Sequence, residues 1–123
     1  MAAPNLAAPN SITGKAAFVT CTSTSEVTIL SNGSASSACL RVTSLMLANV
    51  DGTNSVDATV KVYNAASGGT GYSVASTLAV PADSTVVVFG RDNAVYLEED
   101  RRITVAPSAA SDLEVICSYE EVT

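Results

Sequence analysis

Three residues with side-chain oxygens, Asp51, Asn54 and Asp57, lie within seven positions of one another in the segment "VDGTNSVD". A helix–loop–helix calcium site needs oxygen ligands at alternate positions, a central glycine and a terminal bidentate glutamate. Here the spacing is three, and Gly52 directly follows Asp51. An Asp-Gly pair favours a hairpin, because both turn residues must accept positive φ. We therefore predict a metal-free turn between two strands at 51–57, with an opportunistic surface Ca²⁺ site as the alternative.

Catalytic chemistry has few candidates in this chain. There is no histidine, which excludes Ser-His-Asp and Cys-His catalysis. Carboxylates gather at Glu98, Glu99 and Asp100, and others stand in turns at Asp83 and Asp92. A glycosidase pair must face each other across a cleft, and a small domain with short loops leaves little room for one. We predict no enzymatic activity, no catalytic residue and no cofactor.

The chain has three cysteines, Cys21, Cys39 and Cys117, and each lies in an apolar or Thr-rich run. Cysteines without histidine and without a Cys-x-x-Cys pair make a poor zinc site. An odd number also does not close a disulfide framework. We predict buried free thiols that act as small hydrophobic side chains. The alternatives are a Cys21–Cys117 or a Cys39–Cys117 bridge.

The net charge of −6 argues against nucleic acid as a partner, because phosphate backbones repel an acidic domain. The stretch "AAPNLAAPN" after Met1 has neither the basic region nor the long apolar region of a signal peptide. The chain also has no run of about 18 apolar residues. We therefore expect no membrane partner, and synthesis and folding in a reducing cytoplasm.

The elements that must position these residues are strands. Of the residues, 47% are hydrophobic, mostly Val, Ala, Leu and Ile, and many others are Ser and Thr, a mixture that favours strands over helices. Short runs separated by turn signals predict strands at 16–23, 26–31, 39–50, 55–63, 72–80, 84–90, 94–97, 103–107 and 112–121. The sequence predicts one all-β domain over 15–123, a jelly-roll-like β-sandwich of eight or nine strands. An immunoglobulin-like strand order is the alternative.

Two of these runs show the period of two that is typical of a strand with one buried face. We predict that their apolar alternate residues are buried: Val56, Ala58, Val60, Val62, Leu113, Val115, Cys117 and Tyr119. The run "CLRVTSLMLANV" (39–50) predicts one long strand whose second half is apolar on both sides. Strict alternation there groups Leu40, Val42, Met46, Ala48 and Val50 on one face.

Residues 1–14, "MAAPNLAAPNSITG", predict an extended N-terminal arm. The tetrapeptide "AAPN" occurs twice, and each proline favours extended backbone in the residue before it. Candidate partner contacts are Pro4, Asn5, Pro9 and Asn10. We predict that the arm lies ordered against a neighbouring chain in an assembly and is mobile in the free domain. A frayed terminus is the alternative.

The segment "LEEDRR" (97–102) is the densest charge cluster of the chain. Its charged members are Glu98, Glu99, Asp100, Arg101 and Arg102, and their charges nearly cancel. One interpretation is a solvated turn. The other is a polar rim that contacts a partner, where such groups set orientation more than affinity.

Several stretches together resemble small virion structural proteins of tailed bacteriophages, most closely those of contractile-tailed phages of marine cyanobacteria. They are "SITGKAA" after an "MAAPN" start, "LRVTSLMLANVDGT", "YSVASTLAVPADSTVVV" and "VYLEEDRRITVAPSAASDLEVICSYEE". The resemblance covers nearly the whole chain. The chain departs from the pattern at 98–102, where "EEDRR" replaces an expected "EEGD".

The resemblance implies a structural component of a virion, assembled in the host cytoplasm, and not an enzyme. A capsid decoration protein that binds the major capsid protein on the outside of the head is the first expectation, with a homo-oligomer such as a trimer on the particle. A neck, baseplate or tail-fibre-associated module is the second expectation. A carbohydrate-binding adhesin is the third, although the chain has no Trp and only 5% aromatic residues.

Overall fold

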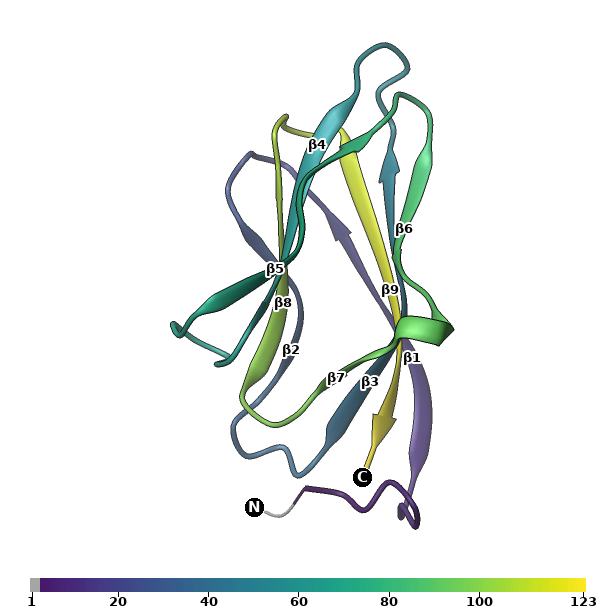
Figure 1. Ribbon diagram of the computed structural model, residues 1–123, viewed down its shortest axis with the longest axis vertical. Coiled ribbons are helices and arrows are strands. Elements are labelled where there is room, and N and C mark those ends of the chain that lie inside the picture. The colour runs from purple at the N-terminus through teal and green to yellow at the C-terminus, as the bar shows by residue number, and fades with distance from the viewer. Residues whose placement is uncertain (1–2) are drawn as a thin grey trace.

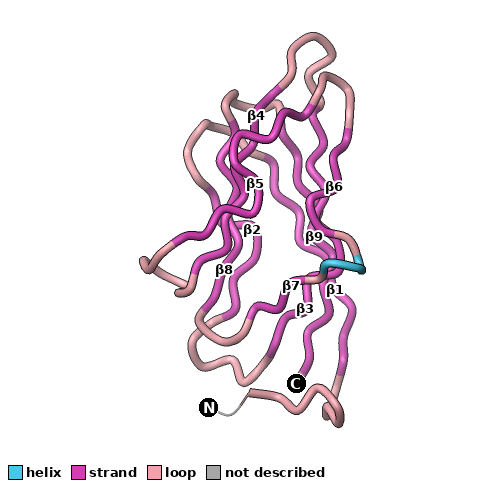
Figure 2. The backbone as a smooth tube through the Cα atoms, viewed as in Figure 1, coloured by secondary structure: helices cyan, strands magenta, loops and turns pink. Residues whose placement is uncertain are grey.

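The computed structural model describes residues 3–123 and has nine strands in two antiparallel sheets that pack face to face (Figures 1 and 2). The strands are β1 (Ile12–Thr20), β2 (Val27–Asn32), β3 (Cys39–Asn49), β4 (Val56–Tyr63), β5 (Gly71–Val80), β6 (Thr85–Phe89), β7 (Val95–Leu97), β8 (Arg101–Pro107) and β9 (Leu113–Val122). A short 3-10 helix, η1 (Arg91–Asn93), precedes β7, and residues 3–123 contain no α-helix. The prediction of an all-β sandwich is confirmed.

Strand pairing follows the order of a jelly roll. β4 pairs with β5, β3 with β6, β2 with β8 and β1 with β9, so the chain forms one long hairpin that is folded over on itself. Additional pairs, β3 with β9 and β4 with β8, complete the first sheet (β1-β9-β3-β6) and the second sheet (β2-β8-β4-β5). β7 also pairs with β3, on the same edge as β6. The jelly-roll prediction is confirmed, and the immunoglobulin-like alternative is wrong.

A β-bulge in β3 decides which side chains of its long apolar run enter the core. The register with β9 shifts between Val42 and Ser44, which makes Thr43 an extra residue. An extra residue turns every later side chain to the opposite face. Val42 is therefore buried before the bulge and Leu45 is buried after it, whereas Met46 points outward. The prediction from strict alternation, which placed Met46 with Val42, is wrong for this reason.

The core predicted on β4 and β9 is confirmed at most positions. Six of the predicted side chains are at most 1% exposed: Val56, Ala58, Val60, Leu113, Val115 and Cys117. The other two, Val62 and Tyr119, are partly buried and pack against the same cluster. Their period of two was therefore a reliable signal, because the extra residues at the bulges lie in the partner strands β5 and β3 and not in β4 or β9.

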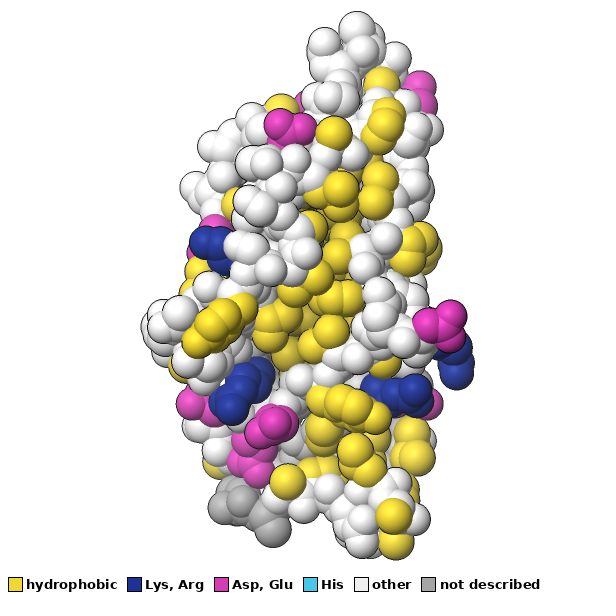
Figure 3. Space-filling model, viewed as in Figure 1, with side chains coloured by type: hydrophobic (Ala, Val, Ile, Leu, Met, Phe, Trp, Pro, Cys, Tyr) yellow, Lys and Arg dark blue, Asp and Glu magenta, His cyan; other side chains and the backbone are white. Residues whose placement is uncertain are grey.

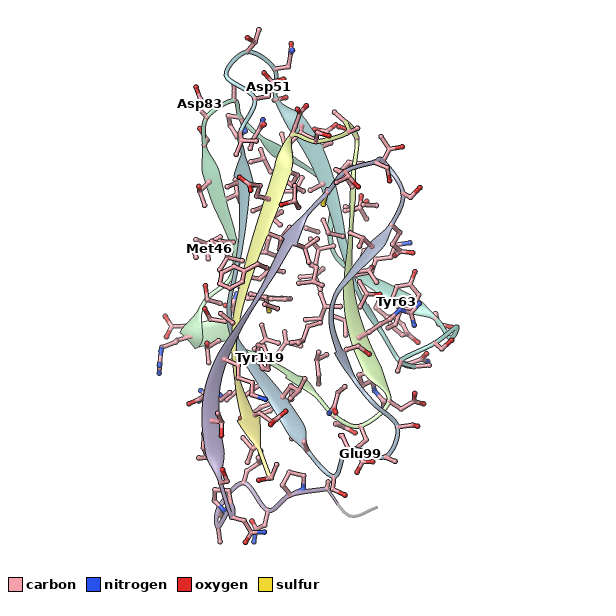
Figure 4. The ribbon with its side chains drawn as sticks, turned by 180° about the vertical axis from the view of Figure 1, so that it is seen from behind. Met46, Asp51, Tyr63, Asp83, Glu99 and Tyr119 are labelled. Carbon is pink, nitrogen blue, oxygen red and sulfur yellow. The ribbon has the colours of Figure 1, made fainter. Side chains whose placement is uncertain are left out.

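Two buried asparagines join the sheets at opposite ends of the sandwich. Asn49 lies beside Asp51 and Asn32 lies beside the turn of Glu99, and Figure 4 shows these two neighbours at the two ends. Asn32 ends β2 in the second sheet, and its Nδ2 donates to the carbonyl of Leu97 on β7 of the first sheet, at 2.9 Å. Asn49 ends β3 in the first sheet, and its Nδ2 donates to the carbonyl of Val80 on β5 of the second sheet, at 3.0 Å. Each amide therefore ties its strand to the opposite sheet with a hydrogen bond shielded from water.

The segment 51–57 connects the two sheets, and the predicted hairpin turn is wrong. β3 and β4 belong to different sheets, and neither Asp51 nor Gly52 has positive φ. Asp51 Oδ1 instead accepts a hydrogen bond from the Thr53 amide at 2.9 Å, and the same contact lowers the pKa of the Asp51 carboxyl. The Asp51 carbonyl accepts one from the Asp83 amide at 3.1 Å, which joins two neighbouring loops (Figure 4). The local Asp-Gly signal is overridden because β3 and β4 find partners elsewhere in the chain.

The three cysteines are buried free thiols in the structure. Burial raises the pKa of the Cys117 thiol to about 11, and it also raises those of Cys21 and Cys39. A thiol whose pKa is raised by folding stabilises the fold below its ordinary pKa, and this contribution is lost as the pH rises through the folded value.

We expect the native thiols to react slowly with a disulfide reagent at pH 8, because only the exposed thiolate is a nucleophile. After unfolding in denaturant, all three groups should titrate. Unfolding midpoints should also fall as the pH rises from about 9 to 11, the interval over which Cys117 ionises only in the unfolded chain. Recovery of a single reactive group after unfolding would instead show a bridge.

Candidate binding surface

The N-terminal segment lies against its own domain. Asn10 and Ser11 donate backbone hydrogen bonds to the Thr123 carbonyl at 2.8 and 3.3 Å, and Ser11 accepts one from the Thr123 amide at 2.9 Å. β1 then begins at Ile12, inside the segment 1–14 that the sequence assigns to the arm. Residues 3–9 precede this ladder and are called the ordered arm below; the first two residues of the predicted arm lie outside the described residues.

A turn bends the ordered arm back along the end of the sandwich. The Asn5 carbonyl accepts a hydrogen bond from the Ala8 amide at 3.1 Å, and Asn5 Oδ1 accepts one from the Ala7 amide at 3.0 Å. An asparagine that caps its own turn in this way holds the local backbone without help from the domain. Asn5 therefore shapes the arm, while Leu6 within the turn remains 48% exposed.

The ordered arm and the turn before β8 meet at one end of the molecule. Pro4 and Leu6 line a depression of about 280 Å³ together with Tyr96, Glu98 and Glu99. Figure 4 shows Glu99 at the end where the arm lies. The side chain of Glu98 is 71% exposed. The structure thus brings two predicted contact segments, far apart in sequence, into one surface with apolar walls and acidic groups at its rim.

Asp100 shapes this turn from inside. It has φ 61, in the left-handed region that favours glycine. Its amide donates to the Asn32 carbonyl at 3.0 Å, and its Oδ1 accepts from the Ala66 amide at 2.9 Å. These bonds, one to the end of β2 and one to the β4–β5 loop, stabilise a conformation that an L-residue rarely adopts. Asp100 therefore stabilises the turn through contacts within its own chain.

Arg101 also binds groups of its own chain. Its Nη1 donates to the carbonyls of Asn64 and Asp100, both at 3.1 Å. Its Nη2 lies 3.8 Å from Glu98 Oε2, a loose and exposed ion pair that adds little stability. Arg101 therefore connects the acidic rim to the β4–β5 loop (residues 64–70).

Arg102 fixes the middle of the same loop. Its Nη1 donates to the carbonyls of Ala65 at 2.6 Å and Gly68 at 2.9 Å. Its guanidinium stacks on the ring of Tyr63, 3.7 Å from the centroid, a cation–π geometry. Of the five charged residues predicted as rim contacts, Glu98 and Glu99 thus border the depression, whereas Arg101 and Arg102 organise the loop beside it.

A polar cluster that the sequence did not reveal lies next to Arg102. Glu26 accepts hydrogen bonds from the hydroxyls of Thr104 at 2.6 Å and Tyr63 at 2.8 Å. The Thr104 hydroxyl is the main cause that lowers the pKa of Glu26, and the Glu26 carboxylate raises the pKa of Tyr63. The cluster joins the β1–β2 loop to β4 and β8. No spacing in the sequence could have indicated it, because its members come from three separate segments.

An apolar groove runs between the edge strands β5 and β6 and was also missed. It has a volume of about 470 Å³ and is lined by residues 74–79 and 86–88. Figure 3 shows it as the hydrophobic strip along the middle of the molecule. Neither lining segment contains a charged residue. The sequence predicts both strands but does not show which strands are edges.

The chemistry offered by the arm end of the sandwich is apolar contact combined with acidic acceptors. Residues 3–123 contain no group of three or more His, Cys, Asp or Glu side chains placed to hold a metal ion. Within the same residues, no helix has the length and apolar character needed to cross a membrane.

Comparison with known proteins supports the fold. No family model and no curated protein matches this chain. A subunit of Bacillus endospore appendages, described as disulfide-linked pili, is 16% identical with a TM-score of 0.54, over 92% of this chain and 88% of that one. A chain of the acidic stable capsid of Helicobacter pylori bacteriophage KHP30 is 10% identical with a TM-score of 0.50, over 94% and 90%. At these identities the similarity shows a shared jelly-roll fold over nearly the whole chain.

Proposed function

We propose that this protein is a structural component of a virion, and more specifically a decoration protein on the outer surface of a phage head. The observation that carries the proposal is the joint surface at the arm end, where Pro4 and Leu6 meet Glu98 and Glu99. The fold supports it, because similar jelly rolls occur in a phage capsid and in pili, which are both assemblies of many subunits. The resemblance of the sequence to small phage virion proteins points the same way.

The joint surface suits a partner with a small apolar projection and a basic rim, as a capsid protein can present. Glu98 and Glu99 would orient the contact, since complementary charges steer and align partners more than they add affinity. Ordering a free arm costs roughly 1–2 kcal/mol per residue, and an arm already turned by Asn5 has part of this cost met before binding. Contacts at the arm and at the rim are then made together and reinforce one another.

Deleting residues 2–9 is expected to weaken retention on the particle by about 100-fold, because one of two linked contacts is lost. The melting temperature of the isolated domain should change by less than about 3 °C. The ladder of Asn10 and Ser11 with Thr123 remains, and the backbone bonds of the removed arm are internal to it. Co-sedimentation of the purified protein with heads stripped of it measures retention, and circular dichroism measures the melting temperature.

A charge variant tests the acidic half of the surface with a matched control. Glu98→Lys with Glu99→Lys should release the protein from heads at low salt, whereas Asp92→Lys, an exposed acid on η1, should not. Immunogold labelling of intact virions then locates the chain. Label on the neck, baseplate or fibres would replace the head assignment with a tail role, and an absence of label from virions would contradict the proposed function altogether.

A further inference from the structure

The outer face of the first sheet, which points away from the second sheet, carries an apolar row across four strands. Phe18 on β1 lies opposite Ile116 on β9, and Ile116 lies opposite Met46 on β3. Met46 in turn lies opposite Val87 on β6. Directly opposed residues of antiparallel strands share a face, so the four side chains stand side by side. Figure 4 shows Met46 on this outer side of the sheet.

The row is exposed although it is apolar. Phe18 is 74% exposed, Val87 59% and Ile116 38%. A groove of about 310 Å³ lies between this row, at Phe18, Ile116 and Met46, and the neighbouring row of Thr20, Glu114, Ala48 and Thr85. Single apolar side chains on a surface are ordinary, whereas a contiguous apolar patch marks an interaction site.

We propose that a second copy of this chain docks on this face about a two-fold axis that runs parallel to the strands, between β9 and β3. These are the two central strands of the order β1-β9-β3-β6. Rotation about this axis leaves each row of opposed residues at the same height along the strands and reverses the order of the strands across the sheet. As a result, β9 faces β3 of the other copy and β1 faces its β6. The apolar row then covers its counterpart, with Phe18 against Val87 and Ile116 against Met46, as in two sheets that pack face to face.

A second row on the same face, nearer the arm end, also pairs favourably with its counterpart under this two-fold rotation. Glu120 on β9 lies opposite Arg41 on β3 and forms an ion pair with it at 3.1 Å. In the dimer Glu120 of each copy faces Arg41 of the other, so opposite charges meet. Tyr96 on β7, which is 50% exposed, faces Gly14 on β1, where an added Cβ would meet nothing within 4 Å. The large ring therefore lies against a position with free space.

A third row lies on the other side of the apolar row, away from the arm end, and it brings no like charges together across the interface. Glu114 on β9 faces Ala48 on β3 of the other copy, and Thr20 on β1 faces Thr85 on β6. Like charges do not oppose each other in any of these three rows, although the chain has a net charge of −6. A two-fold interface requires one surface that is complementary to itself. This property selects a second copy as the occupant over an unrelated protein.

Sedimentation equilibrium of the full chain at about 1 to 200 μM tests the association, the range in which a modest interface dimerises. The mass should rise from 12.5 kDa toward twice that value. Phe18→Asp should abolish the rise without changing the melting temperature, because Phe18 is largely outside the core. Tyr72→Asp, at an aromatic residue 62% exposed on β5 of the second sheet, should leave the rise intact. A wild-type chain that stays monomeric or forms a trimer would overturn the proposal, as would a Phe18→Asp variant that still dimerises.

A cross-linking experiment tests the axis itself. Thr20 and Thr85 are exposed and lie on opposite edge strands of the first sheet. A short bismaleimide should join a Thr20→Cys chain to a Thr85→Cys chain when the two are mixed. Either variant alone should not react with itself, since its two sites would lie about 14 Å apart, three strand spacings. Equal cross-linking of each variant alone would overturn the proposed arrangement, and the buried native thiols provide an unreactive background.

Discussion

Replacing Asn32 with alanine is expected to lower the free energy of unfolding by about 3 kcal/mol, because two buried carbonyls lose their donor at once. The Asn32 amide donates to Ala38 and Leu97, both at 2.9 Å, and the residue is 3% exposed. Water cannot reach these carbonyls without opening the end of the sandwich. Urea unfolding at neutral pH measures the change.

Asn54→Ala is the matched control, since Asn54 is exposed and its side chain makes one long contact, at 3.4 Å to Asp51. Its effect should stay within about 0.5 kcal/mol. Asn49→Ala removes the equivalent bridge at the other end and should behave like Asn32→Ala. Equal stabilities of the Asn32 and Asn54 variants would show that the sheets do not depend on these amides.

Leu45→Ala is expected to cost about 3 kcal/mol or more, the sum of the lost burial and the cavity left in a packed core. Leu45 is 0% exposed and is the first core residue after the bulge at Thr43. The neighbouring variant Met46→Ala removes a side chain of similar size from the outer face. It should cost less than about 1 kcal/mol. Both are measured at low protein concentration, where association contributes nothing to stability.

This pair of variants decides the position of the core face on β3. If the bulge is where the structure has it, Leu45 and Met46 differ strongly although they are adjacent and both apolar. Similar losses in the two variants would contradict the bulge and would favour a strand buried on both sides. A larger loss for Met46→Ala would restore the strict alternation that the sequence indicates.

Strand positions were predictable because they follow from local composition. Val56 to Val62 and Leu113 to Tyr119 alternate without interruption, and the structure places both runs in strands with their apolar faces toward the core. The bulge at Thr43 was not predictable, since it depends on the register with β9, more than seventy positions away. The connection at Asp51 failed for the same reason: an Asp-Gly pair favours a turn but does not determine which sheet the next strand joins.

For the candidate surface, too, local features could be predicted from the sequence, whereas features that depend on long-range contacts could not. The sequence indicated that residues 3–9 are uncharged and that Glu98 and Glu99 lie near a turn. It predicted an extended arm, whereas the structure has a turn at residues 5–8. It could not show that the jelly roll brings these segments to one end. It also could not show that Arg101 and Arg102 bind the carbonyls of residues 64–68. The hydrogen-bond partners of these arginines depend on contacts between distant segments. An exposed arginine and one that stabilises a loop therefore cannot be distinguished from the sequence.

The place of β9 has a consequence for how the protein is made. It is the ninth strand in sequence order, yet it lies in the middle of the first sheet, between β1 and β3. The other eight strands are therefore synthesised before this sheet can close, and until then β1 and β3 each expose an unpaired edge and an apolar inner face. Contacts this distant in sequence form slowly, and partly folded chains with open edges join one another readily. The first sheet can thus close only after β9 has been synthesised, and the interval before that is the stage at which this protein is most vulnerable to aggregation.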